Sequence, residues 1–135
     1  MRLTAALALI TSSLVLAACG GGDGSDSSDE HENTSPAVAR KEVGETRDAL
    51  RAALATYKGG DKAAAAEQVA EAYVSHFEEV EGPLESKNGE LKESLEHAIS
   101  DELRADIKAG KPAAEIEAQV RAIVADLDKA EAALR

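Results

Sequence analysis

A histidine and a glutamate stand three positions apart in the sequence, at His76 and Glu79. Residues at this spacing lie on one side of a helix, so that an imidazole and a carboxylate could bind the same cation. Glu81 lies two positions further on, at the opposite flank of the same helix, and Glu78 points close to solvent. The residue types and spacing therefore offer His76, Glu79 and Glu81 as candidate metal ligands.

The same stretch is also compatible with a structural role. Its apolar face comprises four residues at helical spacing: Val69, Tyr73, Phe77 and Val80. At about 100° per residue, His76 lies at the edge of this face. Its ring would then pack against a neighbouring helix and bond a backbone carbonyl or a carboxylate, while the three glutamates form a solvated acidic face. Because a helical His-x-x-Glu arises easily by chance, the pattern alone favours this structural interpretation.

A second group of polar residues follows some twenty positions later in the chain. Glu96 flanks an apolar stripe, whereas the adjacent His97 points away from it and is expected to be exposed. Glu102 and Asp106 fall nearer the apolar side than acids normally do, and a buried carboxylate needs a partner such as an arginine or a metal. An acidic pair facing His76 would form an oxygen-rich site that suits iron or manganese.

Sequence patterns typical of catalysis do not occur in this chain. There is no Gly-x-Ser-x-Gly, no glycine-rich phosphate loop and no paired-cysteine zinc motif. Imidazole could come only from His31, His76 and His97. We therefore expect that the protein is not an enzyme.

A signal for export and lipid attachment is predicted near the amino terminus. Arg2 precedes an apolar run from Leu3 to Ala18, which is typical of a secretory signal peptide. The run closes on Leu16-Ala17-Ala18-Cys19, which resembles the lipobox of bacterial lipoproteins. The resemblance implies thioether lipidation of Cys19, cleavage before it, and acylation of the new amino terminus, as by palmitate. An ordinary signal peptide or a short membrane anchor is the alternative, although the run is short for a span.

Residues 19–35 are predicted to be a disordered, acidic linker after the signal peptide of residues 1–18. No apolar residue occurs between Gly20 and Ser35, so this stretch cannot bury enough surface to fold. The chain has a formal net charge of −11. Such an acidic protein is not expected to bind nucleic acid or to hold anionic lipid by charge. The lipid on Cys19 would anchor it to the extracytoplasmic face of a bacterial membrane.

Residues 36–135 carry four amphipathic helical patterns and no period-two alternation. Ser35 and Pro36 are suited to cap and begin the first helix, and Asp61 is suited to cap the second. The expected breaks are, in order, Gly59-Gly60, then Gly82-Pro83 with a loop through Ser86, Asn88 and Gly89, and finally Gly110-Lys111-Pro112. Short connections between helices of similar length predict an all-α, up-down four-helix bundle.

The expected core consists of apolar residues that recur on one face of each helix. Aromatic residues make up 2% of the chain, and alanine supplies much of the apolar surface, so we expect close packing and modest stability. The core positions in the four helices are Val43, Thr46, Leu50, Ala53, Leu54 and Tyr57; Ala66, Val69, Tyr73, Phe77 and Val80; Leu91, Leu95, Ile99, Leu103 and Ile107; and Ile116, Val120, Ile123, Val124, Leu127 and Leu134.

The predicted bundle resembles the extracytoplasmic helical domain of some bacterial members of the high-affinity iron permease family. The residues that carry this resemblance are Tyr73, Phe77, Glu78, Val80, Glu81 and Leu84, then Glu96, Leu103-Arg104, Ile107, Gly110 and the closing Ala130-Glu131-Ala132-Ala133-Leu134. The resemblance implies a role in iron entry and adds Glu78 to the candidate ligands. The sequence shows neither the permease segments nor the Arg-Glu-x-x-Glu motif of that family, so we do not expect it to transport iron itself.

Two functions are thus expected from the sequence. In the first, a lipid-anchored bundle binds or presents iron, or docks on an iron permease, with His76, Glu78, Glu79, Glu81 and Glu96 as candidate ligands. The His-x-x-Glu of residues 76–79 also matches that of imelysin-like iron-uptake proteins. In the second, a structural or interaction lipoprotein of the cell envelope uses its apolar edge or acidic face to bind a partner without any metal.

Overall fold

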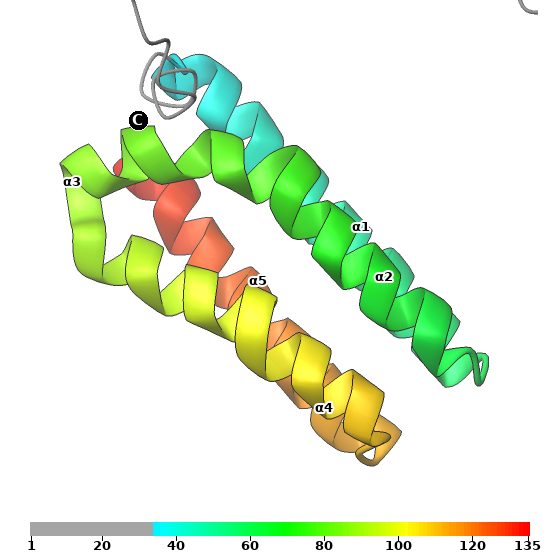
Figure 1. Ribbon diagram of the computed structural model, residues 1–135. Helices are drawn as coiled ribbons and strands as arrows, with labels where there is room; N and C mark the ends of the chain where they lie inside the picture. The colour runs from blue at the N-terminus through cyan, green and yellow to red at the C-terminus, as the bar shows by residue number, and fades with distance from the viewer. Residues whose placement is uncertain (1–33) are drawn as a thin grey trace, which may run out of the picture.

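The computed structural model describes residues 34–135, which are almost entirely helical (Figure 1). No strand occurs among these residues, so the predicted all-α class is confirmed. The expected signal peptide, Cys19 and nearly all of the linker lie outside the described residues. Within residues 34–135, no helix combines the length and apolar character needed to cross a membrane.

The helical elements follow one another closely along the chain. Two of them, named η2 and η3, are π-helical and continue directly into the α-helices on either side. The elements are α1 (Pro36–Lys58), α2 (Lys62–Ala72), η2 (Tyr73–Phe77), α3 (Glu78–Glu96), η3 (His97–Leu103), α4 (Arg104–Ala109) and α5 (Ala113–Ala133).

The first two helices begin where the capping residues predict. The Ser35 hydroxyl accepts a hydrogen bond from the Val38 N–H at 3.3 Å, and the Asp61 carboxylate accepts one from the Ala64 N–H at 3.0 Å. These bonds satisfy amide groups that have no partner within the first helical turn. Gly60, with a φ of 99°, makes the turn between the two helices in a conformation that glycine adopts at little cost.

The prediction that Gly82-Pro83 ends the second helical segment is wrong, because α3 continues through both residues. A proline inside a helix removes a backbone hydrogen bond and costs about 3 kcal/mol. Pro83 and the following Leu84 are both buried. Burial of a leucine side chain contributes roughly 1.5–3 kcal/mol, which offsets much of that cost.

The expected loop through Ser86, Asn88 and Gly89 is reduced to a break at one residue. Asn88 has a φ of −160° and a ψ of 82°, whereas the residues before and after it are helical. The Asn88 side chain accepts a hydrogen bond from the Leu91 N–H at 3.1 Å and so caps the second part of α3. The chain changes direction at this break (Figure 1).

The helices of the described residues pack side by side along their length. α1 packs against α2 and α5, α3 packs against α5, and α2 packs against α4. Figure 1 shows that α2 and α4 run in opposite directions. The start of α1, the bend within α3 and the carboxyl terminus lie at one end of the described part, and the α1–α2 and α4–α5 connections lie at the other.

The core forms largely as the apolar spacing predicts. Of the expected core residues, all are buried except Leu54, Tyr73, Leu91 and Val124, which are partly buried and pack against the core. Thr46 is fully buried, and its hydroxyl donates to the Glu42 carbonyl oxygen one turn earlier at 2.8 Å. That bond satisfies a polar group that would otherwise be costly to bury.

Candidate functional site

The candidate ligands of the second helical segment lie in and beside η2. In this π-helical turn the Glu78 N–H donates to the Tyr73 carbonyl, five residues earlier, so the segment holds one residue more than an α-helical turn. Such an insertion shifts the side chains that follow around the helix axis. The angular positions expected from an unbroken helix therefore do not hold beyond Phe77.

His76 pairs with a carboxylate on α1. Its Nδ1 lies 2.8 Å from Glu42 Oε2, with 31% of the His76 side chain and 14% of the Glu42 side chain exposed. Lys41 Nζ lies 3.1 Å from the other oxygen of Glu42. The hydrogen bond with His76 lowers the pKa of the Glu42 carboxyl most, and Lys41 lowers it further. This geometry agrees with the structural role considered above for His76, in which the ring bonds a carboxylate of a neighbouring helix.

Glu79 has a different partner from His76. The Thr34 hydroxyl, just before α1, donates to Glu79 Oε2. The two residues of the His-x-x-Glu pattern therefore fasten α1 and the chain before it to the segment η2–α3. The structure does not bring them together on one ligand.

Glu81 accepts a hydrogen bond from the Tyr73 hydroxyl at 2.6 Å. Burial raises the pKa of the Glu81 carboxyl, the Tyr73 bond lowers it, and the negative charges of Glu96 and Glu78 raise it further. Burial also raises the pKa of the Tyr73 hydroxyl, and the bond to Glu81 adds to the increase. Two other predicted ligands, Glu78 and Glu96, thus lie close enough for their charges to act on Glu81.

Glu96 shares a single cation with Glu85. Lys92 Nζ lies 3.3 Å from Glu96 Oε2 and 3.4 Å from Glu85 Oε2. The predicted ligand set is therefore divided. His76 and Glu79 contact α1 and the residue Thr34 before it, whereas Glu81 and Glu96 lie around Tyr73. Within residues 34–135, no group of three or more His, Cys, Asp or Glu side chains has a geometry that could hold a metal ion.

The acidic residues of the third segment also have partners other than His76. His97 is 62% exposed, as expected, and its two ring nitrogens lie 3.0 Å from Asp101 and 3.4 Å from Glu102. The expectation that Glu102 lies near the apolar side is wrong, because 61% of its side chain is exposed. Asp106 is at the boundary as expected, where Lys111 Nζ lies 2.9 Å away and the Gln119 amide donates to it.

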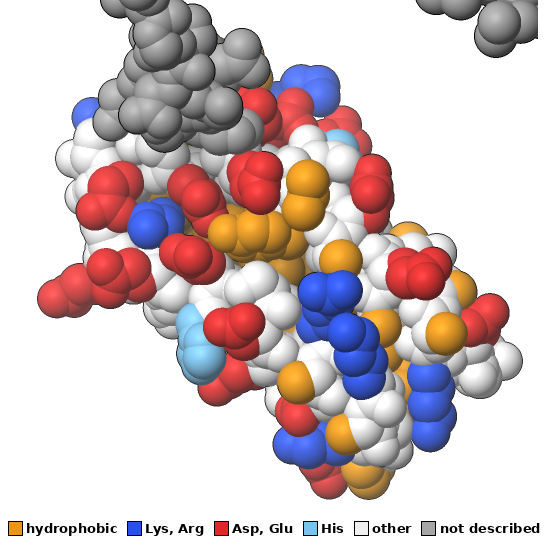
Figure 2. All heavy atoms as spheres, viewed as in Figure 1, with side chains coloured by type: hydrophobic (Ala, Val, Ile, Leu, Met, Phe, Trp, Pro, Cys, Tyr) orange, Lys and Arg blue, Asp and Glu red, His pale blue; other side chains and the backbone are white. Residues whose placement is uncertain are grey.

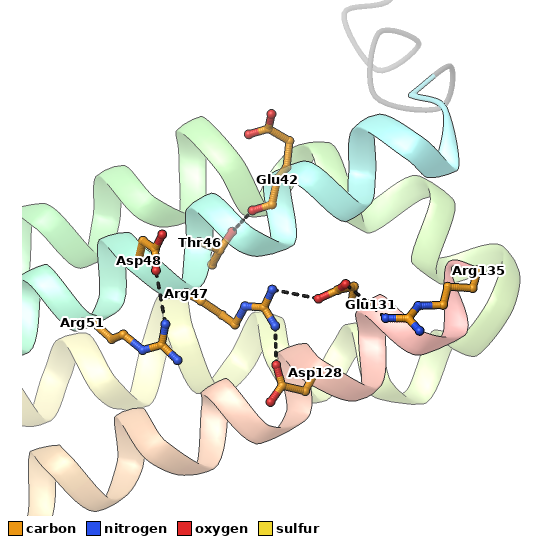
Figure 3. A network of polar contacts seen from close by, with 8 residues as sticks. All are labelled: Glu42, Thr46, Arg47, Asp48, Arg51, Asp128, Glu131 and Arg135. Atoms are coloured by element: carbon orange, nitrogen blue, oxygen red, sulfur yellow. Dashed lines mark hydrogen bonds and ion pairs between the residues drawn. The ribbon is translucent and has the colours of Figure 1, made fainter.

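A polar network that the sequence analysis missed joins α1 to α5 (Figure 3). The Arg47 guanidinium contacts Asp128 and also lies 2.8 Å from Glu131, with 21% of its side chain exposed. Arg40, also in α1, donates to the carbonyl of Leu134, the residue that follows α5, at 2.7 Å. Position 47 follows a buried threonine at the edge of the apolar stripe, and this spacing is the signal that could have identified it.

The acidic charge of the described residues is concentrated in one part of the fold. Residues 63–103, here called the acidic arm, contain eleven acidic residues and only two basic ones, Lys87 and Lys92. Val74 lies in this arm and is 57% exposed, and Val38, in α1, is the other exposed large hydrophobic residue among residues 34–135. Figure 2 shows hydrophobic side chains at the middle of the face formed by α2 and α4, with acidic side chains beside them.

Comparisons of the chain with protein-family models, with curated proteins and with solved structures give no match. The resemblances to the lipobox and to the iron permease domain therefore rest on the residues of the sequence alone.

Proposed function

We propose that this chain is a lipid-anchored protein of the extracytoplasmic face of a bacterial membrane, and that it acts by binding another protein chain. In this proposal the helices form an up-down four-helix bundle, with the break at Asn88 dividing its second and third members. The lipid on Cys19 and the linker of residues 19–35 hold the bundle near the membrane and let it move above the surface.

The observation that carries the proposal is the acidic arm with its exposed Val74. Val74 is exposed in a segment with an excess of carboxylates, and a partner that covers this side chain and supplies cations would gain from apolar burial and from charge complementarity. His76, Glu79, Glu81 and Glu96 each have a bonding partner inside the fold, and these contacts explain their positions without a metal. The proposal therefore rests on the surface of the acidic arm within residues 34–135.

The test places a photoreactive residue at Val74 in the full chain within cells, with Val38 as the matched control. Both side chains are exposed, at 57% and 47%, but only Val74 lies in the acidic arm. The proposal predicts that illumination links Val74 to a protein in the membrane fraction and that Val38 gives no such product. Equal linking at both positions, or recovery of the chain outside the membrane fraction, would contradict it.

A second candidate function retains iron as cargo, bound by this protein or presented to a permease. It is favoured by the oxygen donors around Tyr73, where Glu81 bonds the phenol and the charges of Glu78 and Glu96 act on Glu81. Carboxylate and phenol oxygens suit iron and manganese better than copper(I). Calorimetry with Fe²⁺ and with Mn²⁺ tests this candidate on the full chain.

The variants for that titration separate the two halves of the predicted ligand set. Binding through the Tyr73 group would be lost in Glu81→Gln, Glu96→Gln and retained in His76→Ala, Glu79→Ala. Binding through the His-x-x-Glu pattern would instead be lost in His76→Ala, Glu79→Ala and retained in Glu81→Gln, Glu96→Gln. Absence of heat with both metals would remove the iron-binding version of the function.

A further inference from the structure

An apolar hollow of about 200 Å³ lies on the seam between α1 and α5. Leu54 of α1 and Val120 and Val124 of α5 form its apolar lining. Val120 is almost fully buried, whereas Leu54 and Val124 are partly buried and pack against the core. Two of the expected core residues that the fold leaves partly exposed therefore meet at this place, on neighbouring helices.

Polar contacts join α1 to α5 on either side of the hollow but not at it. On one side, Arg47 contacts Asp128 and Glu131. On the other side, Lys58 Nζ lies 2.6 Å from Glu117 Oε2. Between positions 48 and 57 of α1, no side chain forms a hydrogen bond or ion pair with a residue of α5, both helices being fully described. An apolar ligand can therefore enter the hollow without breaking a polar contact between the helices.

Two exposed guanidinium groups line the hollow, one from each helix. Arg51 extends from α1 toward α5, about one turn from Arg47 (Figure 3). Arg121 comes from α5. Each has one carboxylate partner on its own helix: Asp48 lies 3.2 Å from Arg51, and Glu117 lies 3.5 Å from Arg121. Exposed ion pairs between residues one turn apart are weak and exchange readily.

The carboxylates beside the hollow are already held by cations. Glu117 is the single acid of the lining, and it lies closer to Lys58 than to Arg121. Asp128, further along α5, is held by Arg47. Because a guanidinium carries several N–H donors, Arg121 and Arg51 keep donors that these contacts do not use. A ligand with its own carboxylate can bind to those donors.

We propose that the hollow binds an anionic amphiphile of the fatty-acid class, that is, an unbranched alkyl chain with one terminal carboxylate. The alkyl chain covers Leu54 and Val124, and the carboxylate lies between Arg51 and Arg121. Arginine suits this role because its paired N–H donors match the two oxygens of a carboxylate. None of these residues belongs to the acidic arm, so the inference goes beyond the proposed function.

The size of the hollow limits how much of the ligand it can hold. Sites that enclose a whole small molecule measure about 300–1,000 Å³, so a hollow of about 200 Å³ covers only a segment of the alkyl chain. Each methylene group that becomes buried raises the affinity about fourfold. The affinity should therefore rise with the length of the alkyl chain and stop rising once the hollow is filled.

The experiment uses decanoate that carries a photoreactive diazirine on its alkyl chain, added to the full chain in its membrane. Illumination links the bound probe to the side chains beside it, and mass spectrometry of the resulting peptides locates the link, so probe dissolved in the lipid does not obscure the result. We expect links within residues 51–58 and 117–124. They should be about tenfold more frequent than with the matching alcohol or amine, which lack the carboxylate.

Charge variants test the two guanidinium groups. Arg51→Gln, Arg121→Gln should reduce the linking about tenfold or more, because it removes both groups that bind the carboxylate. Lys129→Gln, Arg135→Gln is the matched control. It makes the same change of charge at two exposed residues that each contact a carboxylate about one turn away and do not line the hollow. This control should leave the linking unchanged.

A second pair of variants tests the hollow itself while both arginines remain. Val124→Trp places a large side chain in the hollow and should reduce the linking about tenfold or more. Ala125→Trp places the same side chain at the neighbouring position, which is exposed and does not line the hollow, and should leave the linking unchanged.

The outcomes either support the site or overturn it. Equal linking by decanoate and the alcohol, or unchanged linking in Arg51→Gln, Arg121→Gln, overturns the anionic ligand. Links elsewhere in the chain, or links that Val124→Trp does not reduce, overturn the hollow as the site. Circular dichroism checks that each variant is helical, and the arginine variant alone decides the test if Val124→Trp does not fold. None of these results depends on Val74, so the proposed function is tested separately.

Discussion

Nδ1 of His76 lies 2.8 Å from Oε2 of Glu42, and this contact joins η2 to α1 across 34 positions of sequence. The pair is partly buried and gains a third member in Lys41, which contacts the other Glu42 oxygen. The histidine that suggests metal chemistry in the sequence is thus a link between helices in the fold.

If this link is structural, its removal will lower stability. We expect His76→Ala to reduce the free energy of unfolding by about 1 kcal/mol at neutral pH, because it breaks a partly buried hydrogen bond. Urea unfolding followed by circular dichroism measures the change. His97→Ala is the matched control, with a ring that is 62% exposed and an expected change below about 0.5 kcal/mol. Equal losses in both variants would contradict the assigned role.

Glu81 is expected to weaken the fold at neutral pH. Because burial raises the pKa of its carboxyl, the folded state binds a proton more readily than the unfolded state. The resulting penalty is present at neutral pH and disappears as the pH falls through the raised pKa toward the ordinary value of 4.5. Glu81→Gln should therefore increase the free energy of unfolding at pH 7 by up to about 1 kcal/mol.

The pH dependence and a second variant check this prediction. The stability difference between Glu81→Gln and the unchanged chain should be largest near neutral pH and shrink on acidification. Tyr73→Phe removes the hydroxyl that donates to Glu81 and should destabilise the fold by about 1 kcal/mol. A difference for Glu81→Gln that stays constant from about pH 7 to about pH 4 would show that the carboxyl is not perturbed.

Gly110 is required by its backbone conformation. Its φ of 73° lies in the left-handed region, and a Cβ there would also meet the Lys62 side chain. We expect Gly110→Ala to destabilise the fold by roughly 1–2 kcal/mol. Gly44 lies inside α1, where a Cβ has room, so Gly44→Ala should stabilise by roughly 0.5–1 kcal/mol. Thermal unfolding of both variants should give midpoint shifts of opposite sign.

The Arg47 network should contribute more than the other ion pairs of α1. Arg47 contacts Asp128 and Glu131 on α5, whereas Arg51 contacts only Asp48, one turn away on its own helix (Figure 3). Arg47→Ala is expected to cost about 1 kcal/mol in low salt and less in high salt, and Arg51→Ala a few tenths at most. Chemical unfolding at two salt concentrations measures both, and an Arg47 effect that does not depend on salt would contradict the ionic origin.

Local rules predicted the elements of this fold well where the local signal and the packing agree. Ser35, Asp61 and Gly60 mark helix ends in both the sequence and the structure, and the apolar spacing identifies the core of each helix. Pro83 is the counterexample, since its local tendency to end a helix is overcome by the burial of Pro83 and Leu84. A rule about one residue cannot include the packing of its neighbours.

The candidate site was harder to predict because its contacts are long-range. The spacing of His76 and Glu79 is a local pattern, but their partners, Glu42 and Thr34, come from the beginning of the fold. The π-helical turns also change the angular positions of side chains, and no feature of the sequence indicated them. Pairing across helices and insertions in the helix both follow from the tertiary structure.

The most direct test of binding through the acidic arm is the size of the complex that the full chain forms when extracted from its membrane in mild detergent. We predict that the unchanged chain migrates as a complex, that Val74→Asp shifts it to a single chain, and that Val38→Asp leaves it intact. Both substitutions place a charge at an exposed valine, so they differ only in the surface they alter. A complex that survives Val74→Asp, or that Val38→Asp disrupts equally, would contradict the account.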